Sequence, residues 1–158
     1  MSVQEETAGS GLLAEQPYLT GVVAGVVSAI LTGLVIYFGF DRAIIGEHIP
    51  EAVGLTGDAV GWATLLIIGA VLGLVYAGLA NVGALDAYLS TASSAGITGL
   101  VYGIVLWVIA IVVVPFLMGD GVGGIGEYAV TVEGILGFAL LGSIIGVVYV
   151  LLPALTGR

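Results

Sequence analysis

Four long stretches of the chain carry no charged side chain, and this spacing restricts the possible folds more than any other feature. They cover residues 16–40, 59–85, 87–119 and 134–157. Each is long enough for a helix of about 20 residues across a hydrocarbon core of about 30 Å. Only helices and closed barrels satisfy every backbone group in lipid, and a continuously apolar stretch favours a helix over an alternating barrel strand. We therefore predict an all-α integral membrane protein, with transmembrane helices near residues 19–40, 60–80, 95–118 and 133–152.

The composition excludes several other classes of protein. Hydrophobic residues make up 59% of the chain and charged residues only 8%, whereas a soluble domain has about 25% charged residues. The absence of cysteine removes disulfides, thiolate metal sites and thiol catalysis. Eleven acidic residues against two arginines give a net charge of −9, so a nucleic-acid partner, which needs a basic surface, is not expected.

The predicted helices also set the domain organisation. We expect residues 1–18 to form a polar, acidic tail and residues 19–158 a single domain whose last helix ends at Pro153. Four crossings place both termini on one side of the cell membrane. Arg42 and Arg158 then fall on opposite sides, so the positive-inside rule gives a tie. Orientation stays open, with cytoplasmic termini the preferred choice. In the first long connection, Ile44, Ile45, Ile49 and Val53 predict a short amphipathic segment lying on the membrane surface.

An internal duplication is visible in the spacing of glycine and tyrosine. Gly61, Gly69, Gly73 and Tyr76 recur 73 residues later as Gly134, Gly142, Gly146 and Tyr149. The first helices of each half align, with one residue inserted, as GVVAGVVSAIL from Gly21 and AGITGLVYGIVL from Ala95. An even number of helices per copy makes the copies parallel. We therefore predict two parallel two-helix repeats, residues 19–80 and 95–153, the alternative being a chance match among glycine-rich helices.

Each predicted helix carries two glycines four positions apart. Glycine at this spacing allows helix backbones to approach closely in a membrane. We predict that these glycines pack helices together, either within the bundle or outward against a partner protein. The glycines are Gly21, Gly25, Gly69, Gly73, Gly99, Gly103, Gly142 and Gly146.

The predicted helix interiors contain no acid, base or histidine, although ionisable groups there usually mark function. We therefore predict a protein that is not an enzyme, with no catalytic residue, metal ligand or cofactor. His48, with Glu47 and Glu51 nearby, is expected to be a loop residue. Hydroxyl side chains in the helices are expected to bond to carbonyls of their own helix. Tyr76 and Tyr149 are expected at the membrane interface or, alternatively, as a pair that contacts a lipid or quinone.

The two-helix repeats with GxxxGxxY endings, the absence of lysine and the acidic tail resemble small four-helix membrane proteins of unknown function from halophilic archaea. The resemblance covers essentially the whole chain and implies an accessory subunit beside a larger complex. Our first hypothesis is a non-catalytic subunit that packs through Gly-rich faces against other integral membrane subunits, such as those of a respiratory terminal oxidase. The alternative is a small homo-oligomeric channel or carrier for a neutral or lipidic solute. Membrane lipid is a partner in both.

Overall fold

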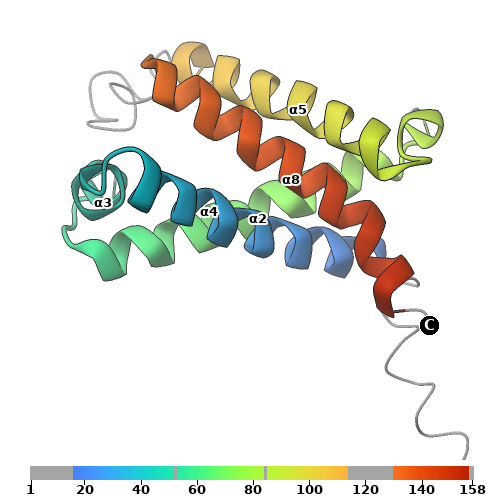
Figure 1. Ribbon diagram of the computed structural model, residues 1–158, viewed down its shortest axis with the longest axis horizontal. Helices are drawn as coiled ribbons and strands as arrows, with labels where there is room; N and C mark the ends of the chain where they lie inside the picture. The colour runs from blue at the N-terminus through green and yellow to red at the C-terminus, as the bar shows by residue number, and fades with distance from the viewer. Residues whose placement is uncertain (1–15, 52, 84, 114–129, 157–158) are drawn as a thin grey trace, which may run out of the picture.

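The computed structural model describes residues 16–51, 53–83, 85–113 and 130–156, and they form the helices shown in Figure 1. Four helices are long and apolar enough to cross a membrane, and there is no strand in the described ranges. The predicted all-α, multi-pass membrane fold is therefore confirmed. The long helices are α2 (Pro17–Gly39), α4 (Asp58–Ala80), α5 (Ala92–Val108) and α8 (Val132–Thr156). The short ones are η1 (Ile44–His48), α3 (Ile49–Glu51), η2 (Asp86–Tyr88) and η3 (Ile109–Val113).

Local chemistry explains where two of the long helices begin. A proline occupies the first turn of α2, where its missing N–H costs no helical hydrogen bond. Helix α5 begins earlier than predicted because of a capping box. The Thr91 side chain accepts from the Ser94 backbone N–H, and the Ser94 side chain accepts from the Thr91 N–H, both at 3.2 Å.

The ends of the last two long helices differ from expectation in different ways. Pro153 was expected to end the fourth helix, but α8 continues through it to Thr156, so that prediction is wrong. Proline removes one helical hydrogen bond, and in the last turn the helix tolerates this loss because few bonds remain to be broken. After α5 the chain continues as η3 to Val113. The predicted end of this helix at residue 118 lies outside the described residues.

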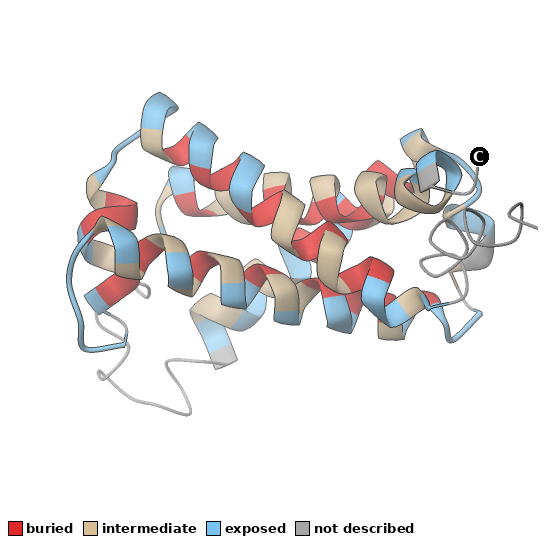
Figure 2. Ribbon diagram, turned by 90° about the horizontal axis from the view of Figure 1, so that it is seen from below, coloured by how far each residue is buried: buried red, intermediate tan, exposed pale blue. Residues whose placement is uncertain are grey.

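The four long helices pack as two hairpins. Helix α2 lies against α4, α5 lies against α8, and the hairpins meet mainly along α2 and α8. Figure 1 shows α8 running between α5 on one side and α2 with α4 on the other. Buried residues follow the inward faces of the helices in Figure 2.

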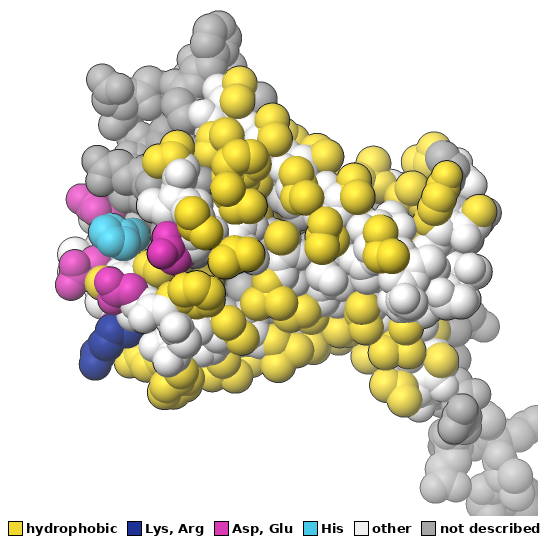
Figure 3. All heavy atoms as spheres, turned by 45° about the horizontal axis from the view of Figure 1, so that its top comes forward, with side chains coloured by type: hydrophobic (Ala, Val, Ile, Leu, Met, Phe, Trp, Pro, Cys, Tyr) yellow, Lys and Arg dark blue, Asp and Glu magenta, His cyan; other side chains and the backbone are white. Residues whose placement is uncertain are grey.

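Most charged side chains of the described residues lie at one end of the molecule. On the face shown in Figure 3, the acidic, arginine and histidine side chains cluster at the end that carries α3, and hydrophobic side chains are spread over the remaining described surface. This separation fits a bundle that crosses a membrane and places its charged connection in water.

The isoleucines of the first long connection do not anchor it on lipid. Ile44, Ile45 and Ile49 are buried against the protein, Ile45 completely, whereas Val53 is 53% exposed. The carbonyl of Ile45 lies where a side chain at Gly61 would be, so η1 packs directly onto α4. The prediction of a membrane-surface segment is therefore wrong for the isoleucines. An amphipathic pattern does not say whether its apolar face meets lipid or protein.

Candidate functional site

The first hairpin is held by close contact between two glycine pairs. A Cβ atom built on Gly25 would collide with the carbonyl oxygen of Gly69, and one on Gly73 would collide with the carbonyl oxygen of Gly21. The backbones of α2 and α4 therefore touch without intervening side chains.

The second hairpin uses the same kind of contact. A Cβ on Gly99 would collide with the carbonyl oxygen of Gly142, a Cβ on Gly103 with that of Phe138, and a Cβ on Gly146 with that of Ala95. All eight glycines singled out in the sequence thus lie at a helix contact inside their own hairpin. Whether the hairpins descend from one duplicated unit stays a prediction.

Side chains, rather than glycine backbones, join the two hairpins. Ser28 Oγ on α2 donates to the carbonyl of Leu141 on α8 at 2.6 Å. Tyr102 Oη on α5 donates to the carbonyl of Leu72 on α4 at 2.8 Å. The expectation that hydroxyls bond within their own helix holds for Thr98, which donates to the Ser94 carbonyl at 2.9 Å, and is wrong for Ser28.

The predicted tyrosine pair lies inside the bundle together with a third tyrosine. The Tyr76 ring centroid is 5.6 Å from that of Tyr149 and 5.2 Å from that of Tyr102. Tyr76 is only 1% exposed, so its side chain is part of the core and not of an interfacial belt. Its hydroxyl has no hydrogen-bond partner among the described residues. Contact of Tyr76 and Tyr149 with a lipid or quinone stays a prediction.

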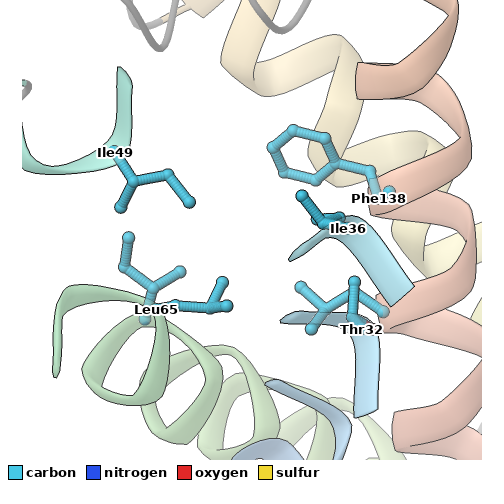
Figure 4. A pocket seen from close by; sticks show the side chains of 8 residues that line it. Thr32, Ile36, Ile49, Leu65 and Phe138 are labelled. Carbon is cyan, nitrogen blue, oxygen red and sulfur yellow. The ribbon is translucent and has the colours of Figure 1, made fainter. Parts of the chain in front are cut away.

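A cavity of about 120 Å³ lies between the two hairpins, near the charged end. In Figure 4, Ile49 and Leu65 face Thr32, Ile36 and Phe138 across this space. The exposed lining is entirely apolar, so Thr32 contributes its methyl group and not its hydroxyl. The cavity is partly enclosed, and it is lined by Thr32, Ile36, Ile49, Leu65, Ile68, Gly137, Phe138 and Leu141.

A second apolar groove adjoins the cavity along the seam between α2 and α8. It has a volume of about 230 Å³ and shares Ile36 and Gly137 with the cavity. The two spaces therefore lie next to each other along the seam. The groove is lined by Val35, Ile36, Phe40, Leu136, Gly137 and Leu140.

A small polar network lies at the charged end of the molecule. Asp58, in the first turn of α4, accepts a hydrogen bond from Tyr37 Oη at 2.9 Å and pairs with Arg42 at 3.5 Å. The guanidinium of Arg42 also lies 5.6 Å from the centroid of the Tyr37 ring. Gly46 lies close beside this network, because a Cβ there would lie 2.5 Å from a carboxylate oxygen of Asp58 and the Asp58 side chain would have to shift.

His48 lies in η1, and the described part of the chain holds no cluster of three potential metal ligands.

The cavity was not predicted from the sequence. Six of its lining residues have ordinary apolar side chains, the other two are Thr32 and Gly137, and all are spread over four helices. Nothing in their local pattern distinguishes them from residues that face lipid. Only the packing of α2, α3, α4 and α8 brings them together.

Comparisons with protein-family models, curated proteins and solved structures found no match to this chain. Its function is therefore inferred from the site itself.

Proposed function

We propose that this membrane protein binds or carries a lipidic molecule. The hydrocarbon chain of that molecule would occupy the cavity between the two hairpins. The supporting observation is a partly enclosed cavity with a wholly apolar lining, placed between two halves of a membrane-spanning bundle. Such a space offers nothing to a polar solute, which would lose its hydrogen bonds on entry.

The size of the cavity fits part of a chain. An apolar cavity of about 150 Å³ in a protein core stays dry and holds a ring of six carbons. A space of about 120 Å³ therefore holds a few carbons, and the rest of the chain would leave through the open side into the bilayer. Binding would be driven by van der Waals contact with the lining, because lipid tails are already apolar.

The division between the hairpins favours a carrier among lipid-binding functions. Backbone contacts hold each hairpin together, whereas side chains and two hydrogen bonds join the hairpins. Movement of one hairpin against the other would open the cavity without breaking either glycine contact. Rigid-body motion of bundle halves around a central site is how many transporters work.

The accessory-subunit hypothesis rested on two observations, the Gly-rich helix faces and the absence of ionisable residues inside the helices, and the first of these no longer supports it. It relied on Gly-rich faces being available to a partner, and all eight glycines are engaged inside their own hairpins. A role beside a respiratory oxidase therefore stays a prediction, as does a homo-oligomeric state.

A fluorescence experiment tests lipid binding. The chain has two tryptophans, and the Trp62 ring packs over Gly33 beside the cavity-lining Leu65. In a Trp107→Phe background, a lipid-like alcohol with a brominated chain should quench Trp62 saturably, since bromine quenches on contact. Saturation distinguishes a site from general exposure to lipid.

Two neighbouring residues supply matched variants for this experiment. Ile68 lines the cavity and is 36% exposed, whereas Ile67 is 66% exposed and is absent from the lining. Ile68→Phe should fill the open side and weaken binding about tenfold, equal to about 1.4 kcal/mol. Ile67→Phe should leave binding unchanged. Quenching that never saturates, or that is equal in all three proteins, would refute the proposal.

A further inference from the structure

We infer that the entrance to this site selects an amphiphile with an uncharged or cationic head group over one with an anionic head group. The inference rests on the proposed function, because it concerns the part of the ligand that lies outside the cavity. It comes from the charges that surround the apolar lining at the end of the molecule carrying α3.

The cavity and groove lie just inside the charged end. Ile49 lines the cavity, and Glu47 and Glu51 are each two residues away from it in the chain. Phe40 lines the adjoining groove and directly precedes Asp41. Figure 3 shows acidic side chains at this end of the molecule, so a chain held in either space with its head group toward this end would place that group near these carboxylates.

The carboxylates outnumber the cations at this entrance. Besides the three named above, Asp58 begins α4 and Glu133 lies in the first turn of α8. The basic side chains of the described residues at this end are His48, which lies between Glu47 and Ile49 in the chain, and Arg42, which is already paired with Asp58 at 3.5 Å. An anionic head group would meet net repulsion, and no uncommitted arginine or lysine of the described residues is there to receive it.

The partial charges of the helix termini do not change the net negative charge at this entrance to a positive one. The N-termini of α4 and α8 reach this end and carry partial positive charge, which would attract an anion. Each terminus already has a carboxylate of the chain in its first turn, Asp58 or Glu133. Part of the attraction is therefore satisfied within the protein.

The expected selectivity is moderate and depends on salt. Exposed charges interact weakly in water, and they are screened beyond about 10 Å at 0.1 M ionic strength and about 3 Å at 1 M. We expect an uncharged amphiphile to bind about fivefold more tightly than an anionic one of the same chain at about 0.1 M salt, and less than twofold more tightly at about 1 M.

Three probes with one shared chain test this selectivity. They are dibromostearyl alcohol, dibromostearyl phosphate and dibromostearyl trimethylammonium, added to the Trp107→Phe protein in vesicles of uncharged lipid. Saturable quenching of Trp62 gives an affinity for each. Equal affinities for the alcohol and the phosphate at low salt would overturn the inference while leaving the proposed function intact. Failure of all three probes to quench saturably would instead refute the proposed function.

Charge-removal variants locate the effect. Glu47 and Glu51 are exposed, and the double variant Glu47→Gln/Glu51→Gln should at least halve the preference for the alcohol without changing the affinity for the alcohol itself. Glu5→Gln/Glu6→Gln removes the same amount of charge from the N-terminal region, outside the described residues, and should leave the preference unchanged. If both double variants reduce it equally, the preference reflects net charge and the inference is wrong.

Discussion

At the scale of single residues, glycines differ sharply in what they tolerate, and Gly25 and Gly78 show the contrast. A Cβ at Gly25 would strike the Gly69 backbone, whereas nothing lies within 4 Å of a Cβ at Gly78. We predict that Gly25→Ala destabilises the protein by at least about 2 kcal/mol, because the backbones must separate. Gly78→Ala should be neutral or stabilising by up to about 1 kcal/mol, since alanine favours the helix. Unfolding in SDS followed by circular dichroism measures both, and equal stabilities would show that the glycine contact is dispensable.

Residue identity predicts some of these environments better than others. The glycines could be singled out from their spacing, because no other residue permits such close backbone approach. The burial of Tyr76 could not, because a tyrosine near a helix end is equally suited to the membrane interface. The partner of Ser28 was also unpredictable, since a serine in a helix has a carbonyl of its own helix within reach.

At the scale of elements, the seam between the hairpins depends on two hydrogen bonds from side chains. We predict that Ser28→Ala and Tyr102→Phe each cost about 0.6 kcal/mol, up to about 1.7 kcal/mol, the range measured for hydrogen bonds between membrane helices. Thr98→Val is the control, because Thr98 bonds only within α5. The SDS unfolding assay measures all three. If Thr98→Val lowers the free energy of unfolding as much as the other two variants, the hydrogen bonds between the hairpins stabilise the protein no more than a bond within one helix.

The charge-free stretches of the sequence predicted that the four long helices exist. They predicted only some of the helix ends and helix contacts. All four helices form, since hydrophobic length alone determines a membrane crossing. The extension of α8 beyond Pro153 depends on how few hydrogen bonds the last turn has to lose, and the burial of Ile45 depends on tertiary context. The cavity was beyond prediction for the same reason, because it exists only where α2 crosses α8 beside α4.

At the scale of the whole molecule, four crossings require both ends of the helical bundle to lie on one side of the membrane. The chain has no cysteine, so single cysteines can report topology without background. We predict that Gln16→Cys and Leu155→Cys react alike with a membrane-impermeant maleimide in right-side-out vesicles, and that Leu55→Cys gives the opposite result. All three positions are exposed. Labelling of Leu55→Cys together with either of the others would contradict a four-crossing topology, and the pattern also fixes the orientation.

The glycine contacts within each hairpin have a consequence for how the protein is made. Each contact joins helices that are consecutive in the chain, so the first hairpin has its full set of backbone partners before α5 has been synthesised. Assembly would then proceed in two steps during translation, with α2 and α4 pairing first and α8 later completing both its own hairpin and the cavity. The cavity would thus form only after α8 has been synthesised. A nascent chain stalled before α8 should resist extraction as a paired hairpin and yet bind no hydrocarbon chain.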